Sequence, residues 1–435
     1  MRLEAQGLDR GAVLNALDRA RAEPEALAND PVLGPVATEF QRRVRRSASL
    51  VEDTIREQPV GYGMWGREGI DEQAIAQMDL AMRLPVSVAG ALMPDAHVGY
   101  GLPIGGVLAT ESAVIPFAVG VDIACRMRLS LYPVSPIVLG QMPERYRRAL
   151  MERTLFGPGA AWRGNERAER AVLEDEEWAA TPILRALRDK ARGQLGASGS
   201  GNHFVEWGAF TLGAPDPRLG LEVGTYLALL SHSGSRGVGF KIANTYSKIA
   251  EERRPGLDAR ARRLAWLDME SHEGQEYWLS MELAGRFASA NHAVIHHRVA
   301  AAVENHHNFA WREQVRGPSG EEREVIVHRK GATPAGAGVL GIIPGSMADA
   351  GYLIRGRGAA DALDSASHGA GRAMSRTAAL QSVTKTERDR YLRQRGVTLL
   401  GGGLDEAPQA YKRVEQVIAA QSDLVEIMGG TTFRP

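Results

Sequence analysis

The sequence predicts an α+β fold: one large domain built on a mixed sheet with helices packed around it, preceded by a helical N-terminal extension. Residues 1 to about 55 place apolar side chains at three- and four-residue spacing, which is typical of amphipathic helices. From about residue 85, short apolar runs alternate with glycine-rich turns, as in strands joined by tight loops. The chain has 435 residues, of which 44% are hydrophobic, enough to build a large core. We therefore predict an extension at residues 1–55 and the large domain at residues 56–435.

The predicted elements follow in chain order. The extension contains the helical segments AVLNALDRARAE and VATEFQRRVRRSASLVEDTI. Residues 140–192 and 240–312 are predicted to be largely helical, with the strongest periodicity in EYWLSMELAGRFASANHAVIHHRVAAAVENH. Residues 325–403 return to a pattern of strands and glycine turns, and YKRVEQVIAAQ predicts a helix near the end.

Charge and composition limit the classes of partner. The formal net charge is +0, so any contact with nucleic acid must come from a local basic patch. One candidate is the cluster Arg42, Arg43, Arg45 and Arg46, although such a run is more often the solvated face of a surface helix. The charged N-terminus does not resemble a signal peptide, and no apolar run is long enough to span a membrane. A single cysteine excludes an internal disulfide and fits a reducing compartment, so we expect a cytoplasmic protein without a membrane partner.

The histidines fall into two groups. Six lie in the predicted helical middle of the chain and are expected to be structural: His272, His292, His296, His297, His306 and His307. His292 and His296 are four residues apart and could face one metal ion. However, Ala293 stands where the helical zinc signature requires a glutamate.

The second group of histidines lies in loops or directly after apolar stretches. Its members are His97, His203, His232, His328 and His368. Functional side chains converge in loops at strand ends. The only cysteine, Cys125, stands three residues after Asp122 in VGVDIACRMRL. Imidazole, carboxylate and thiolate are metal ligands, and a thiolate can bridge two ions, so the set predicts a metal site. The alternative is that these histidines only form hydrogen bonds to the backbone.

Two absent motifs narrow the nucleotide chemistry. The sequence contains neither the phosphate-binding pattern G-x-x-x-x-G-K-[ST] nor a Lys-x-Asp-Gly motif, so a covalently bound nucleotide would need a nucleophile other than the usual lysine. Seven segments, in this order, closely resemble the RtcB-type RNA ligases: MPDAHVGYGLPIGG, GVDIACRMRL, GSGNHFVE, SHSGSRGVG, HRKGAT, IPGSM and SASHGAGRAMSR. The resemblance extends from about residue 60 to 428 and does not include the opening 55 residues.

The resemblance implies a fold, an activity and cofactors. The large domain is expected to be a catalytic domain of RtcB type. It would join RNA ends bearing a 2′,3′-cyclic phosphate or 3′-phosphate to 5′-hydroxyl ends, with GTP as co-substrate and two Mn²⁺ ions per chain. One ion would be held by Asp122, Cys125 and His203, and the other by Cys125, His232 and His328. The partners would be GTP and RNA with broken ends, such as tRNA halves or damaged RNA, and the need for an activating protein is left open.

The resemblance also assigns roles to single residues. His368 would be the nucleophile that carries GMP before the guanylate passes to the RNA as an RNA(3′)pp(5′)G end, and Asp95 would orient His368. The implied nucleotide contacts are Asn202, His203, Phe204, Val205, Glu206, His328, Arg329, Pro344, Gly345, Ser346, Met347, His368, Gly369, Ala370 and Gly371. The implied RNA contacts are Arg236, Arg372 and Arg376.

This sequence departs from the family pattern at two places. Gly351 stands where the family usually has a serine, and the final segment GGTTFRP lacks the lysine that reads the guanine base, for which Lys412 is no equivalent. The departures leave an alternative open, a metal-dependent RNA end-processing hydrolase (cyclic phosphodiesterase) with impaired guanylylation. A nucleic-acid-binding protein with a relict site is a third class, which the full ligand set disfavours.

Overall fold

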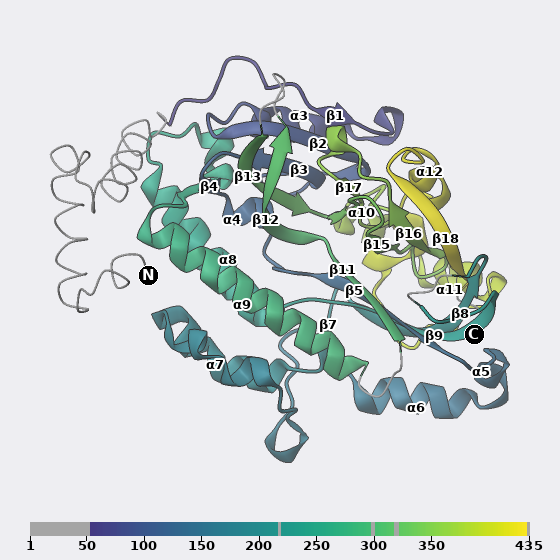
Figure 1. Ribbon diagram of the computed structural model, residues 1–435. Coiled ribbons are helices and arrows are strands. Elements are labelled where there is room, and N and C mark those ends of the chain that lie inside the picture. Colours follow the sequence, from purple (N-terminus) through teal and green to yellow (C-terminus); the bar gives the residue numbers. More distant parts are fainter. Residues whose placement is uncertain (1–52, 216–218, 297–300, 317–321, 433–435) are drawn as a thin grey trace, which may run out of the picture. The chain divides into compact units, whose positions relative to one another are not determined.

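The computed structural model describes residues 53–435, apart from 216–218, 297–300, 317–321 and 433–435 (Figure 1). Residues Ile55–Pro435 form one compact unit. The predicted helical extension, including its four clustered arginines, lies outside the described residues except for its last three positions.

Two large sheets form the centre of this unit, where the sequence predicted a single mixed sheet. The five-stranded sheet has the order β1 (Gly63–Met64), β2 (Ser87–His97), β3 (Ile104–Thr110), β13 (Glu322–Lys330) and β12 (Asn308–Arg316). It is mixed because β1 pairs with β2 in parallel, whereas the other pairs are antiparallel. The seven-stranded sheet is antiparallel throughout, in the order β11 (Ala301–His306), β5 (Arg126–Tyr132), β9 (Gly224–Ser233), β8 (Phe204–Leu212), β18 (Val425–Thr432), β16 (Gly351–Gly356) and β15 (Leu340–Ile343).

One buried cluster joins the two sheets. Met93 on β2 and Val327 on β13 belong to the five-stranded sheet, and Ile354 on β16 belongs to the seven-stranded one. All three side chains are fully buried in the same cluster. Burying an aliphatic side chain of this size contributes about 1.5–3 kcal/mol, so this packing holds the two sheets together.

Three short two-stranded pairs and the helices complete the unit. The pairs are β10 (Leu267–Asp268) with β4 (Ala113–Val114), β14 (Ala332–Pro334) with β17 (Ser365–Ser367), and β6 (Leu155–Phe156) with β7 (Ala197–Gly199). The α-helices are α3 (Glu72–Met82), α4 (Pro116–Val119), α5 (Ile137–Gln141), α6 (Pro143–Arg153), α7 (Pro182–Gln194), α8 (Arg236–Arg253), α9 (His272–Ile295), α10 (Arg376–Ser382), α11 (Lys385–Gln394) and α12 (Val414–Ala419). Among the described residues, no helix combines the length and the apolar composition that crossing a membrane requires.

The long helix α9 ends earlier than the sequence predicts. It begins after Ser271, whose side chain accepts a hydrogen bond from the Gly274 N–H group, and it ends at Ile295. The alanine-rich segment that follows forms strand β11, paired with β5, and the next residues form β12. The predicted helix through residue 312 is therefore wrong, because pairing with neighbouring strands outweighs the helix propensity of alanine.

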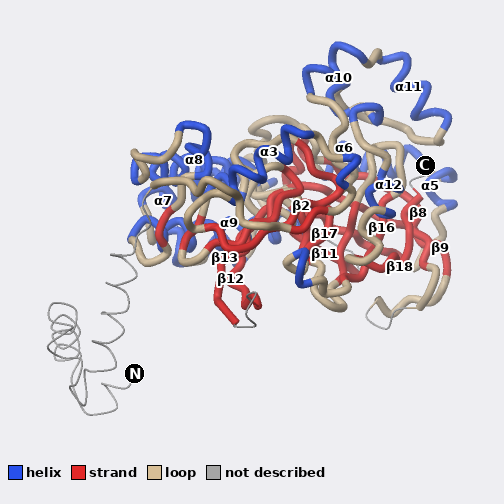
Figure 2. Tube along the Cα trace, turned by 90° about the horizontal axis from the view of Figure 1, so that it is seen from above, coloured by secondary structure: helices blue, strands red, loops and turns tan. Residues whose placement is uncertain are grey.

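Helices α10 and α11 interrupt the region predicted as strands and glycine turns (Figure 2). A capping box starts α11: the Thr384 side chain accepts from the Glu387 N–H group, and the Glu387 side chain accepts from the Thr384 N–H group. Such reciprocal capping satisfies backbone donors that the first helical turn leaves unpaired. The helix predicted near the end of the chain is confirmed as α12.

Candidate metal and nucleotide site

The loop that carries Cys125 is held in an unusual backbone conformation. It connects α4 to β5, and Ala124 has a positive φ of 56°. The Cys125 N–H group donates to the Asp122 carbonyl at 3.1 Å, and the Ala124 N–H group donates to the Asn308 carbonyl at 2.7 Å. A side chain at Gly234 would bring its Cβ to 2.4 Å from Asp122 Oδ1, so only glycine allows this carboxylate its position. Such constraints are typical of functional sites.

Four predicted ligands converge around this loop. Cys125 Sγ lies 3.3 Å from His203 Nε2 and 3.1 Å from His232 Nε2. His203 Nε2 also lies 2.8 Å from Asp122 Oδ2. Potential ligand atoms of Cys125, His203 and His232 all lie within 4.8 Å of one another. The structure thus places side chains from the starts of β5 and β8 and the end of β9 in one cluster.

His328 is not part of this cluster, which corrects the predicted ligand set. Its Nε2 atom accepts a hydrogen bond from the Ile115 N–H group at 2.9 Å, and its Nδ1 atom lies 3.2 Å from the Leu108 carbonyl oxygen. Burial lowers the pKa of His328 to about 4, so the ring is neutral at physiological pH. A neutral imidazole whose nitrogens both contact backbone groups has no lone pair left for a metal ion.

His307 lies where His328 was expected. Its Nε2 atom is 3.2 Å from His232 Nε2, and its N–H group donates to the Cys125 carbonyl at 3.1 Å. His307, which the sequence analysis places in the structural group, therefore lies beside this cluster. The residue stands between β11 and β12, at the point where the chain passes from the seven-stranded to the five-stranded sheet (Figure 1).

The donor set fits divalent cations. His232 Nδ1 faces the Asn202 carbonyl oxygen at 2.8 Å, which fixes the ring proton on Nδ1 and turns the Nε2 lone pair toward Cys125 and His307. The Nε2 atoms of His232 and His307 lie 3.2 Å apart, with the Cys125 sulfur atom beside them. A cation bound by these three atoms would stabilise the arrangement. Burial, followed by the charge of Asp122, raises the pKa of the Cys125 thiol well above its usual value. A bound cation reverses that effect, since a coordinating thiol is deprotonated.

We expect His307→Gln and His328→Gln to behave differently. His307→Gln should lower the content of tightly bound metal, because it removes a nitrogen that faces the cluster. His328→Gln should keep the metal but lower thermal stability, because a buried backbone group that loses its hydrogen bond to the His328 ring costs about 1–3 kcal/mol. Elemental analysis of metal-loaded, desalted protein, together with thermal unfolding, checks both expectations. Metal loss from His328→Gln alone would restore the original ligand set.

The predicted nucleophile and its orienting carboxylate are adjacent. His368 follows β17, and its Nδ1 atom lies 2.6 Å from Asp95 Oδ2 on β2. The Asp95 side chain is fully buried, and that of His368 is 17% exposed. Burial by itself would raise the pKa of Asp95, but the charge and the hydrogen bond of His368 outweigh it and lower that pKa. The His368 and His307 ring centroids are 4.9 Å apart, so the dyad borders the candidate metal site.

The predicted nucleotide segments are only partly suited to contact a nucleotide. The loops at Pro344 and His368 adjoin, because a Cβ at Gly369 would lie 3.4 Å from the Pro344 carbonyl oxygen. The Phe204 ring packs edge-on against His232 with centroids 5.7 Å apart. Burial raises the pKa of Glu206 to about 8, so a ligand could meet this carboxyl group in its protonated form. Asn202 and His203 directly precede β8, and the predicted positions in the two adjoining loops are Gly345, Ser346, Met347, Ala370 and Gly371.

Two predicted nucleotide contacts are buried for structural reasons. Arg329 is 1% exposed, and its side chain binds the Glu313 carboxylate, the Ser365 hydroxyl and the Leu363 carbonyl. Val205 is 8% exposed and packs in a core cluster. The geometry therefore corrects the assignment of Arg329, whose guanidinium donors are already used within the protein.

The three predicted RNA-binding arginines have partners within the protein. Arg236 Nη1 lies 2.8 Å from His203 Nδ1, so this guanidinium group positions a member of the metal cluster. Arg372 is largely buried and directs its three nitrogens at Met374, Glu406 and Asp405. Arg376 pairs with Asp405 at 2.6 Å and with Glu406, and its side chain remains 48% exposed. Of the three, Arg376 is therefore the one best placed to meet an RNA phosphate.

The other histidines of the helical middle are structural where the structure describes them. His292 on α9 and His296, which directly follows this helix, are buried and contact the Ser231 hydroxyl at 2.8 and 2.7 Å. His272 is exposed and lies 3.3 Å from Glu276. His297 and the side chain of His306 lie outside the described residues.

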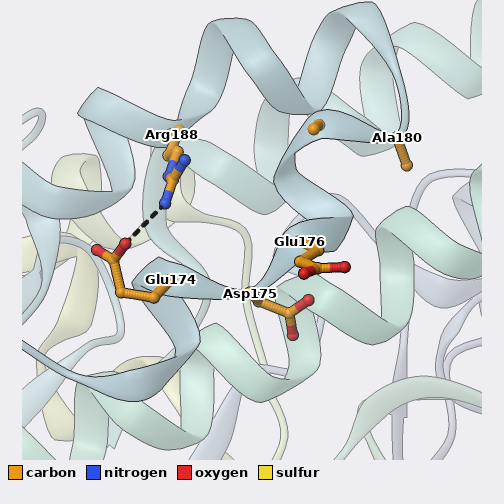
Figure 3. A pocket seen from close by; sticks show the side chains of 6 residues that line it. Glu174, Asp175, Glu176, Ala180 and Arg188 are labelled. Atoms are coloured by element: carbon orange, nitrogen blue, oxygen red, sulfur yellow. Dashed lines mark hydrogen bonds and ion pairs between the residues drawn. The ribbon is translucent and has the colours of Figure 1, made fainter.

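A separate surface pocket contains none of these residues. It is lined by Glu174, Asp175, Glu176, Ala179, Ala180 and Arg188. Figure 3 shows its one cation, Arg188, paired with Glu174 at 3.0 Å. An acidic lining repels phosphate, so this pocket does not compete with the histidine cluster as a site for nucleotides.

Comparison with known proteins places this chain in a family. Residues 77–432 match the family model described as tRNA-splicing ligase RtcB. The RNA-splicing ligase RtcB of Escherichia coli K12 is 32% identical, over 78% of this chain and 87% of its own length. The tRNA-splicing ligase RtcB of Thermococcus kodakarensis is 31% identical, over 81% and 90%. The RNA-splicing ligase RtcB of Mycobacterium tuberculosis is 31% identical, over 76% and 92%.

These matches define the class of protein, an RNA ligase, which is an enzyme that joins RNA ends. The family match covers most of the chain, and the curated ligases of Escherichia coli and Thermococcus kodakarensis are 32% and 31% identical to it over the aligned residues. This chain belongs to the RtcB family of RNA ligases.

Proposed function

We propose that this protein is a GTP- and Mn²⁺-dependent ligase that joins RNA 2′,3′-cyclic phosphate or 3′-phosphate ends to 5′-hydroxyl ends. The observation that carries the proposal is the His368–Asp95 pair, at 2.6 Å, beside a cluster of thiol, imidazole and carboxylate ligands. The proposed ligands are Asp122, Cys125, His203, His232 and, in place of His328, His307. Cations held there would offset negative charge on the phosphates. A buried, lone thiol in this role fits a reducing compartment such as the cytoplasm.

The proposed first step is attack by His368 on the α-phosphorus of GTP. Because Nδ1 of the ring faces Asp95, the Nε2 lone pair is the nucleophile. An Nε2–phosphorus bond forms, the bond between the α-phosphorus and the bridging oxygen breaks, and pyrophosphate leaves. The Nδ1 proton stays between the ring and Asp95, whose negative charge balances the positive charge that develops on the imidazole.

The proposed later steps transfer the guanylate to RNA. A 2′,3′-cyclic phosphate end first adds water, which breaks its bond to the 2′-oxygen and leaves a 3′-phosphate. An oxygen of the 3′-phosphate then attacks the phosphorus of the guanylate, which releases His368 and gives an RNA(3′)pp(5′)G end. The 5′-hydroxyl of the second RNA then attacks the 3′-phosphate, forms the phosphodiester and expels GMP. Arg376 is proposed to contact RNA phosphates, and the substrates would be tRNA halves or other broken RNA.

The rival reading is an end-processing hydrolase, and the relatives' names favour ligation. A direct test uses one RNA ending in a 2′,3′-cyclic phosphate or a 3′-phosphate and a second RNA with a labelled 5′-hydroxyl end. We expect a joined product that requires both GTP and Mn²⁺. If the cyclic phosphate opens but no joined product forms under any nucleotide, the hydrolase reading replaces this one.

A further inference from the structure

Lys412 makes two side-chain contacts around the carboxylate that faces the proposed nucleophile. Its Nζ atom donates to the carbonyl oxygens of Pro94 at 3.1 Å and Ala96 at 2.8 Å. These residues flank Asp95 on both sides, so the ammonium group holds the β2 backbone at the position where Asp95 is carried.

The backbone of Lys412 contacts the loop that carries the nucleophile. Its N–H group donates to the Gly371 carbonyl at 2.9 Å. Gly371, three residues after His368, has a φ of 72°, and a Cβ there would lie 2.2 Å from the Asp95 carbonyl oxygen. Lys412 therefore joins the two segments whose separation sets the distance between His368 and Asp95.

The charge of Lys412 compensates a costly burial. The Asp95 side chain is fully buried, and within the described residues its Oδ1 atom has no hydrogen-bond partner. A buried carboxylate with a single hydrogen bond is stable only beside positive charge. Burial lowers the pKa of Lys412, and the negative charge of Asp95 is the strongest influence that opposes this shift. After those of His368 and His97, the charge of Lys412 also favours the ionised form of this carboxyl group.

We propose that Lys412 is a positioning residue for transfer of guanylate to His368, because it holds the Asp95 strand against the His368 loop and keeps a negative charge behind the imidazole. This role rests on the proposed function above. It concerns the step in which His368 attacks GTP. Sealing of an RNA end that already bears guanylate does not use His368 as carrier and should be independent of Lys412.

The test compares Lys412→Met with Lys412→Arg. Each protein is incubated with α-labelled GTP and Mn²⁺, and the rate of protein labelling is measured as a function of GTP concentration. A second assay follows sealing of a pre-formed RNA(3′)pp(5′)G end to a 5′-hydroxyl end. Lys248→Met, which removes an exposed lysine of α8, is the matched control. Metal content and thermal unfolding are measured for every variant.

We expect the maximal labelling rate of Lys412→Met to fall about tenfold or more, since small misplacement of a reacting group has effects of this size. The half-saturating GTP concentration, the metal content and the sealing of pre-activated RNA should stay within about twofold of the unmodified protein on the same reasoning. Lys412→Arg, which keeps charge and donors, should restore most of the rate. If Lys412→Met does not fold, Lys412→Gln carries the same expectation.

Two results would overturn the inference, and they differ from failure of the proposed function. Normal labelling by a folded Lys412→Met protein excludes the positioning role. Equal loss of labelling, sealing and metal assigns Lys412 a general structural role instead. If the unmodified protein takes no label from GTP, the proposed function itself fails, and the role of Lys412 fails with it.

Discussion

His368→Ala should abolish labelling of the protein by α-labelled GTP. The reason is that His368 Nε2 is the one atom proposed to form a bond to the α-phosphorus, and Asp95 holds the opposite ring nitrogen at 2.6 Å. Loss of a nucleophile commonly lowers the rate by at least about 1000-fold, so labelling should fall to background. Joining of a 3′-phosphate end to a 5′-hydroxyl end should be lost to the same extent.

A substrate that bypasses the first step provides the control. Sealing of a pre-formed RNA(3′)pp(5′)G end should survive in His368→Ala, which excludes misfolding as the cause of the loss. The label on the unmodified protein should be released by mild acid and retained in alkali, as expected for an imidazole phosphoramidate and not for a serine ester. Asp95→Asn should slow labelling and leave the metal content unchanged. Acid-stable label, or label on His368→Ala, would place the nucleophile elsewhere.

Cys125→Ala should remove both metal ions. Cys125 Sγ is within 3.3 Å of two imidazole nitrogens, and the same sulfur is the atom proposed to bridge the ions. Loss of a residue that only hydrogen-bonds to a metal ligand already lowers metal affinity about 10- to 100-fold. Loss of a ligand that two ions share should therefore lower the affinity by more than this. Elemental analysis of protein loaded with Mn²⁺ and then desalted measures the change directly, without reference to activity.

Two comparisons make this metal measurement specific. His272→Ala removes an exposed histidine and should leave the metal content unchanged. His203→Ala should weaken chiefly the ion on the Asp122 side of the cluster. Two tightly bound ions per chain in Cys125→Ala would show that the sulfur does not bridge.

Much of the fold could be predicted from local sequence patterns, but pairing between distant segments could not. The strands β2, β3, β8 and β9 coincide with the apolar runs that glycine loops separate. Residues 301–306 form a strand only because β5 lies beside them, and their own alanines favour a helix. The start of α11 does have a local signal in the sequence, the Thr384–Glu387 capping box.

The candidate site, too, could be predicted only as far as local sequence patterns reach. Asp122, Cys125, His203 and His232 could be selected because they lie in glycine-rich loops, and the structure brings them together. The periodicity of residues 240–312 predicts a helix at His307, although the alternating segment NFAWREQVR directly after it is typical of a strand. His328 also follows an apolar stretch, but its ring is turned toward the backbone of β3, and no sequence pattern specifies that direction.

The place of His307 between the two sheets has a consequence for how the protein reaches its active form. The cluster takes Cys125 and His232 from the seven-stranded sheet and its edge, whereas Asp95 lies on β2 of the five-stranded sheet and meets His368, 273 residues further along the chain. Contacts between segments that lie so far apart in the sequence form slowly during folding, because the long loop between them must close first. Neither sheet alone holds the full set of ligands. Fragments that fold only one of the sheets should therefore be inert, and a nascent chain should acquire the site only when its last strands have docked.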